Sequence, residues 1–179
     1  MPKYVAFLRA INVGGHTVKM DRIRHMFEEM EFADVETYIA SGNVIFDSKS
    51  SSEKTIENKV ENYLRKTLGY EVSVFLRTIS ELTEISEYRP FDKAILDTIG
   101  NSLYIAFLKQ KPTEVSKKKL LSLTTRTDDF HINEREFYWL CRTRMMESSF
   151  SGALLEKIIG TPATLRNSTT VKKIVAKYY

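Results

Sequence analysis

One stretch decides the fold, SLYIAFLKQKP (residues 102–112), because it echoes an earlier stretch, KYVAFLRAIN (residues 3–12). In the later stretch, Phe107-Leu108-Lys109 stands where Phe7-Leu8-Arg9 stood 100 residues before. Both are rich in aromatic and β-branched residues, a composition typical of β-strands. The echo predicts that the same structural unit occurs twice in the chain, each time beginning with this strand.

The first half has the element order of a βαββαβ unit. Gly14-Gly15 ends the first strand, and Ser41-Gly42-Asn43 has the composition of a tight hairpin turn. Thr78 and Glu81 have the spacing of a capping box for one further short helix. From hydrophobic periodicity we predict a strand over 4–12, a helix from Met20 to Met30, strands over 35–40 and 43–48, a helix from about Ile56 to Leu68, and a strand over 70–78.

The second half restarts the same order after a linker. We predict a strand over 102–112, a helix from Val115 to Leu123, strands over 129–133 and 136–142, a helix through Leu154 and Ile159, and a last helix over about 169–178. This half therefore reads as βαββα with an extra C-terminal helix in place of a fourth strand. The predicted fold is α+β, with two tandem ferredoxin-like halves packed together. The expected domains are 1–90 and 102–179, joined by a linker over 91–101.

Composition narrows the class of protein. The chain has 179 residues, 42% hydrophobic and 28% charged, as expected of a soluble globular protein. The N-terminus reads as a strand and not as a signal peptide, and no stretch is long and apolar enough to span a membrane, so we expect a cytoplasmic protein. A single cysteine, Cys141, excludes an internal disulfide. The scattered histidines predict no metal site, and nothing indicates a cofactor.

The charge is unevenly distributed along the chain. Residues 1–100 carry 13 Lys and Arg against 16 Asp and Glu, whereas residues 101–179 carry 14 against 7. A basic second half attracts phosphates or nucleic acid. The alternative is a solvated surface that keeps the protein in solution.

Four blocks of the sequence resemble a known family. LRAINVGG (8–15), TYIASGNVIF (37–46), RPF (89–91) and TLRNSTTVKKI (164–174) are similar to the signature blocks of the DUF1697 family, bacterial proteins of about this length without an established function. The resemblance runs essentially end to end. It implies two ferredoxin-like halves packed together, and it brings no reaction. The last block departs from the family pattern, because Ser168 stands where the family has tryptophan.

The candidate site residues lie at strand ends and turns. Arg9 is set among apolar neighbours in its strand, so it is either paired within the protein or kept for an anion. Arg166 and Asn167 directly precede the last helix, for which Ser168 or Thr169 is the expected N-cap. The alternative role for Arg166 is a structural clamp. We predict an anion site made of Arg9, Asn12, Gly14, Gly15, Ser41, Asn43, Arg166, Asn167 and Thr169.

Three functions from different classes are compatible with these residues. The first is binding of an anionic or phosphate-bearing small molecule in a crevice between the two halves; no general base is evident, so turnover stays open. The second is binding of single-stranded RNA through the basic half, although EFYWLCR (136–142) points Phe137 and Trp139 one way and Tyr138 the other. The third is a non-enzymatic module that self-associates through a sheet edge.

Overall fold

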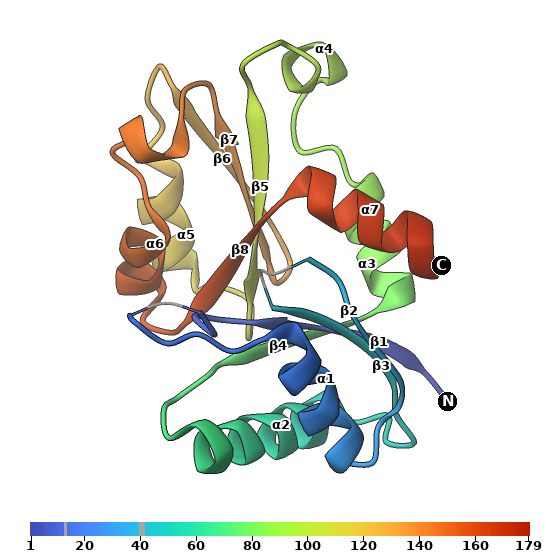
Figure 1. Cartoon of the computed structure of the whole chain (residues 1–179). Helices are drawn as coiled ribbons and strands as arrows, with labels where there is room; N and C mark the ends of the chain where they lie inside the picture. The colour runs from blue at the N-terminus through green and yellow to red at the C-terminus, as the bar shows by residue number, and fades with distance from the viewer. Residues whose placement is uncertain (13, 40–41) are drawn as a thin grey trace. The chain divides into compact units, whose positions relative to one another are not determined.

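The structure is a computed structural model, and it describes residues 1–12, 14–39 and 42–179. The chain divides into two compact units: unit 1 is Met1–Leu82 with Tyr178–Tyr179, and unit 2 is Thr83–Lys177. Each unit contains one four-stranded antiparallel sheet together with helices (Figure 1), so the predicted α+β class is confirmed. No helix within the described ranges is long and apolar enough to cross a membrane.

Unit 1 is built around its first strand. Its elements are β1 (Lys3–Leu8), α1 (Met20–Glu29), β2 (Ala33–Thr37), β3 (Asn43–Asp47), α2 (Glu53–Leu68) and β4 (Val74–Thr78). The sheet order is β2-β3-β1-β4, with β1 antiparallel to both β3 and β4. Because β1 is a central strand, its side chains are buried on both faces, which explains its almost continuous apolar sequence.

The core of unit 1 lies between this sheet and the two helices on one of its faces (Figure 1). Alternate residues of β1 (Tyr4, Ala6 and Leu8) point into that core, as the period of a strand requires. The helices contribute apolar residues at helical spacing: Ile23, Met26 and Phe27 from α1, and Ile56, Val60 and Leu64 from α2.

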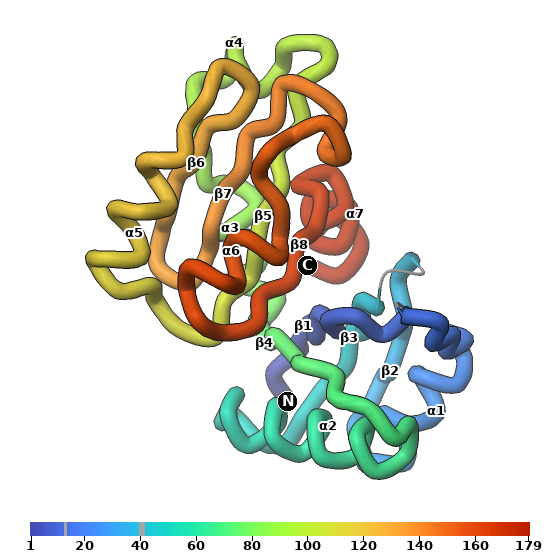
Figure 2. Tube along the Cα trace, turned by 90° about the vertical axis from the view of Figure 1, so that its left-hand side faces the viewer, coloured from blue at the N-terminus to red at the C-terminus, as the bar shows by residue number. Residues whose placement is uncertain are grey.

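Unit 2 repeats the order of elements. Helix α3 (Ile79–Glu87) crosses the boundary from unit 1, and unit 2 continues with α4 (Lys93–Leu96), β5 (Ser102–Leu108), α5 (Glu114–Leu121), β6 (Asp128–Asn133), β7 (Glu136–Cys141), the 3₁₀ turn η1 (Met145–Glu147), α6 (Gly152–Ile159), β8 (Ala163–Asn167) and α7 (Ser168–Tyr178). The sheet order is β6-β7-β5-β8. Figures 1 and 2 show α5 and α6 together on one side of this sheet, where they cover Leu108, Phe137 and Trp139.

The prediction that the second half lacks a fourth strand is wrong. Residues Ala163–Asn167 form β8, which pairs antiparallel with β5 along its whole length. The segment ATLRN contains an arginine and an asparagine, which we assigned to a polar site before the last helix. Pairing with β5 stabilises this strand, and intrinsic strand propensity contributes little to it.

Two further boundaries differ from the sequence prediction. The division into units falls after Leu82 instead of at residue 90, and residues 91–101 belong to unit 2, where they include α4. Strand β1 ends at Leu8, so Arg9 follows the strand and is not part of it. Its backbone N–H still donates to the Ser73 carbonyl at 2.9 Å, which keeps the chain beside β4 for one more residue.

Candidate functional site

Unit 2 contains a cavity of about 530 Å³ on the sheet face opposite α5 and α6. Its walls come from α3 and the turn after it, from α4, from β5 and β7, and from the first turns of α7. This volume lies within the range of about 300–1,000 Å³ that is usual for small-molecule sites. The cavity lies entirely within unit 2.

The floor of the cavity is apolar and buried. Ile105 of β5 and Tyr138 of β7 are 2% and 0% exposed, and both line it. Tyr138 reaches this face because Phe137 and Trp139, its neighbours along β7, point into the core under α5 and α6. The predicted alternation of this strand is therefore confirmed. The Tyr138 hydroxyl donates to the Ile85 carbonyl at 3.4 Å, which links the floor to α3.

Tyr88 stands in the cavity wall and pairs with a histidine. Its hydroxyl oxygen lies 2.7 Å from Nε2 of His131, on β6. Burial lowers the pKa of His131, and the nearby charge of Lys117 acts in the same direction. The neutral imidazole is therefore favoured, and its tautomer sets which of the two groups donates in this hydrogen bond. The Tyr88 ring also lies 5.3 Å from the Tyr138 ring, at an interplanar angle of 36°.

Three cationic side chains line the cavity and act on one carboxylate. Lys93 and Asp97, four residues apart on and after α4, form an ion pair. The hydrogen bond from Lys93 lowers the pKa of Asp97, and the charges of Lys93, Lys172 and Arg89 lower it further. Within the described chain, the side chains of Arg89 and Lys172 form no hydrogen bond or ion pair. Glu87 is the second acidic lining residue, so the lining carries a net charge of +1.

The residues predicted before the last helix have local structural roles. The Oδ1 atom of Asn167 accepts from the Thr169 N–H at 2.9 Å, so Asn167 caps α7, and the prediction that Ser168 or Thr169 does so is wrong. The cap falls earlier because β8 runs directly into the helix. Thr169 is exposed, whereas Ser168 lines the cavity.

Arg166 is 8% exposed and does not line this cavity. Its Nη1 atom donates to Oγ1 of Thr164 at 2.8 Å and to the Leu165 carbonyl at 2.9 Å. Burial lowers its pKa to about 10, so the guanidinium stays charged at neutral pH. These bonds to its own strand give Arg166 a structural role within unit 2.

The predicted residues of the first half lie in unit 1, around the ends of β1 and β3. Asn12 accepts the Val18 N–H through Oδ1 at 2.6 Å and so fixes the loop after β1. Buried Asn43 donates from Nδ2 to the Tyr38 carbonyl at 2.9 Å across the hairpin. Gly14 and Gly15 are exposed and have φ of 65° and 82°. Ser41 lies outside the described residues. Arg9 belongs to unit 1 and Arg166 to unit 2, and a shared crevice for them stays a prediction.

Sequence reasoning missed the residues that line the cavity of unit 2. Lys93 and Asp97 fell in the predicted linker, and Lys172 was not among the predicted site residues. The signal that pointed toward them was the block RPF (89–91), since Arg89 lines the cavity and Tyr88 directly precedes it. The excess positive charge of the second half was a weaker signal, because many of those residues are on the surface.

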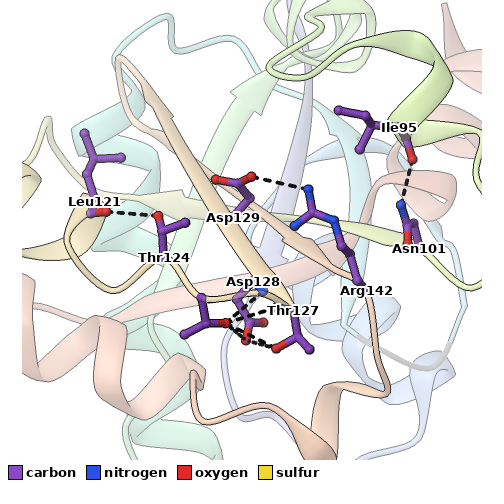
Figure 3. Close-up of polar contacts among 9 residues, drawn as sticks. Ile95, Asn101, Leu121, Thr124, Thr127, Asp128, Asp129 and Arg142 are labelled. Atoms are coloured by element: carbon purple, nitrogen blue, oxygen red, sulfur yellow. Dashed lines mark hydrogen bonds and ion pairs between the residues drawn. The ribbon is translucent and has the colours of Figure 1, made fainter.

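A second polar cluster in unit 2 surrounds Asp128 and is structural; Figure 3 shows its contact with Thr127. Asp128, 1% exposed, accepts hydrogen bonds from Trp139 Nε1 at 2.7 Å, Ser148 Oγ at 2.8 Å and Thr127 Oγ1 at 2.9 Å. Burial alone would raise the pKa of Asp128, but these hydrogen bonds outweigh burial and lower it. Among the residues that the structure describes, no three His, Cys, Asp or Glu side chains come together as a metal site.

Comparison with known proteins adds a family and a fold. The family model described as "Protein of unknown function (DUF1697)" matches residues 1–138. A solved structure, that of the conserved bacterial protein SP0830 from Streptococcus pneumoniae, is similar with a TM-score of 0.75 and 21% sequence identity. The similarity covers 99% of this chain and 98% of that one, and at this identity it concerns the fold alone. No curated protein matches the sequence.

Proposed function

Since the chain belongs to the DUF1697 family, whose description names no activity, we propose from geometry that the protein binds a small anionic ligand in the cavity of unit 2. The ligand carries a phosphate or a carboxylate, and it contacts Arg89, Lys93 and Lys172. The proposal keeps the class of ligand predicted from the sequence and gives it a site within one unit.

The observation that supports this proposal is that three cations, Arg89, Lys93 and Lys172, line one concave site in which Asp97 pairs only with Lys93 among them. Like charges held close together repel one another unless anions compensate them. Asp97 and Glu87 supply two negative charges against three positive ones. A bound anion completes the compensation, and the buried floor excludes water from one side of it, which strengthens its attraction to the cations.

Binding of inorganic phosphate, measured by isothermal titration calorimetry, tests the proposal. Arg89→Ala and Lys172→Ala are each expected to weaken binding about fivefold to tenfold. Lys173→Ala is the matched control, because Lys173 is an exposed lysine of the same helix that does not line the cavity. Equal affinity in the wild type and all three variants would overturn the proposal. So would the absence of binding at phosphate concentrations on the order of 10 mM.

Asp97 provides a test with the opposite sign. Its carboxylate occupies the field of the same cations and therefore competes with an incoming anion. The Asp97→Asn variant is expected to bind phosphate about threefold to tenfold more tightly. Weaker binding by this variant would mean that Asp97 organises the site instead of competing with the ligand.

Single-stranded RNA is the alternative ligand. The geometry favours it less, because Phe137, Tyr138 and Trp139 are all buried and offer no exposed stacking platform on β7. A salt-dependent gel shift with single-stranded RNA separates the two functions. Self-association through a sheet edge, which light scattering measures, is the third candidate.

We also infer that each unit is ferredoxin-like and that the two arose by duplication. The support is that β2-β3-β1-β4 and β6-β7-β5-β8 place corresponding strands in the same order, with the same helices between them. A bacterial origin and a cytoplasmic location remain proposals. The free and buried thiol of Cys141 is compatible with a reducing compartment.

A further inference from the structure

We propose that the anion bound in the cavity of unit 2 carries a planar aromatic ring, as a nucleoside monophosphate or an aryl phosphate does. This inference rests on the proposed function and names its class of ligand. The ring packs beside Tyr88 against the half-buried apolar lining of the cavity, to which Leu96 and Leu103 contribute, while the anionic group contacts the three cations.

The cavity divides into two regions of different chemistry. The side chains of Ile85, Ile105 and Tyr138 are at most 9% exposed, and they come from α3 and the sheet. The cations come from α4, α7 and the turn after α3. A bare phosphate contacts only the cationic region and leaves the half-buried side chains of Leu96 and Leu103, which also line the cavity, without an apolar partner. A ligand with an apolar body and one charged end satisfies both regions.

The tyrosines in the cavity lining favour a planar, aromatic shape for that apolar body. Two of the lining side chains are tyrosines, and both of their hydroxyls already form hydrogen bonds within the protein. The Tyr138 hydroxyl bonds to the Ile85 carbonyl, and the Tyr88 hydroxyl bonds to His131. Their contribution to a ligand is therefore mainly the aromatic ring, and aromatic rings prefer offset or edge contacts with other rings. The two rings lie 5.3 Å apart and are tilted by 36°, so they do not form one closed stack.

The lining of the cavity does not suit a long alkyl chain. Five of the thirteen residues that line the cavity are charged, and two more are tyrosines. A flexible acyl chain needs a continuous apolar channel, whereas a nucleobase or an aryl ring presents apolar faces and polar edges in a compact shape. Arg89 directly follows Tyr88 in the chain, so the aromatic wall and the cationic region are adjacent.

The test is a calorimetric comparison of five phosphates binding to the protein: AMP, UMP, phenyl phosphate, ribose 5-phosphate and inorganic phosphate. Laurate serves as the long-chain anion. The ring-bearing phosphates are expected to bind about tenfold or more tightly than ribose 5-phosphate and inorganic phosphate. Equal binding of all the phosphates overturns the aromatic inference and leaves the proposed function standing, and laurate as the tightest ligand does the same. Failure of every anion to bind overturns both.

Substitution of Tyr88 gives a second readout. Tyr88→Leu is expected to remove most of the preference for ring-bearing phosphates while leaving inorganic phosphate binding within about twofold. Tyr88→Phe keeps the ring, loses only the bond to His131, and is expected to retain the preference. Tyr179→Leu is the control, because Tyr179 is 83% exposed at the C-terminus and does not line the cavity. Retention of the full preference by a folded Tyr88→Leu protein contradicts the proposed role of the ring.

Discussion

The two units have the same strand order and corresponding pairing registers, but different side chains occupy equivalent positions. In unit 1, Tyr4 of the central strand pairs with Phe46 and Thr78; in unit 2, Tyr104 pairs with Trp139 and Asn167. By the same register, Arg77 of β4 corresponds to Arg166 of β8, and both arginines are buried. Nη1 of each donates to the carbonyl of the preceding leucine, at 2.6 Å for Arg77 and 2.9 Å for Arg166.

The difference between the units lies around Phe46 and Trp139. Phe46 packs against the rings of Phe32 and Phe27, at centroid distances of 4.5 and 5.3 Å. Trp139 instead donates to the buried carboxylate of Asp128, which also holds the turn at Thr127 and the segment at Ser148. Trp139 also packs against Phe150 at a centroid distance of 5.0 Å. The same strand position is therefore stabilised by aromatic packing in both units, and in unit 2 a charged hydrogen-bond network is added to it.

The largest expected loss of stability comes from the aromatic cluster around Phe46 in unit 1. Phe46→Ala is expected to destabilise unit 1 by about 4 kcal/mol, because it removes a fully buried ring and leaves a cavity. Hydrogen exchange of the β1 and β3 amides measures the loss. Phe46→Leu, which keeps most of the volume, should lose about 1.5 kcal/mol or less. Similar losses for the two variants would contradict a packing role.

The second-largest effect is expected in the hydrogen-bond network around Asp128 in unit 2. Asp128→Asn is expected to destabilise unit 2 by about 2–3 kcal/mol, since an amide cannot accept from all the donors that surround the carboxylate. The fluorescence of Trp139, the only tryptophan of the chain, reports unfolding of this unit. The control is Asp129→Asn, because Asp129 is partly exposed and pairs with Arg142 at 3.4 Å (Figure 3). It should lose less than about 1 kcal/mol.

Asp128→Asn also changes how the stability of unit 2 depends on pH. Because the folded protein lowers the pKa of Asp128, the unfolded chain binds the proton more readily. The stability that Asp128 contributes is therefore complete above the ordinary aspartate pKa of about 4 and is lost as the pH falls through the lower, folded value. Unit 2 of the wild type should lose stability over this acid range more steeply than unit 2 of Asp128→Asn. Equal slopes would mean that folding does not shift the pKa of Asp128.

The elements with a clear hydrophobic period could be predicted from the sequence. Strand β8, which depends on pairing with β5, and the cavity, which depends on how distant residues pack, could not. The strands of both sheets except β8 were predicted, because their side chains alternate or form apolar runs that tertiary contacts reinforce. Strand β8 was missed, since Arg166 and Asn167 have little strand propensity. The cavity was missed for a related reason: Tyr88, Asp97 and Lys172 are 84 residues apart at the extremes, and no local pattern joins them.

The hairpin turns offer a smaller test of the comparison. Unit 1 uses Gly42 with φ of 77°, and a Cβ atom there would lie 3.0 Å from Cγ2 of Ile11 and 3.1 Å from Cβ of Leu8. Gly42→Ala is therefore expected to destabilise unit 1 by about 2 kcal/mol, through positive φ and close contact together. Gly15→Ala isolates the first of these terms, because nothing lies within 4 Å of its added Cβ, and it should lose about 1 kcal/mol. Equal losses at the two glycines, measured by hydrogen exchange, would exclude a contribution from packing.

The corresponding turn of unit 2 gives the smallest effect and the opposite sign. Glu134, between β6 and β7, has φ of 54°, a left-handed conformation that glycine adopts without strain. Glu134→Gly also removes an ion pair with Lys111, but both side chains are at least 60% exposed, so that loss is close to zero. The variant is expected to stabilise unit 2 by about 0.5 kcal/mol, read from Trp139 fluorescence. Lys111→Ala removes the same ion pair without relieving the backbone and should change nothing measurable. If Lys111→Ala were instead destabilising and Glu134→Gly neutral, the ion pair would stabilise this turn and the positive φ of Glu134 would cost little. The turn of unit 2 would then depend on an ion pair, whereas the turn of unit 1 depends on the backbone conformation of Gly42.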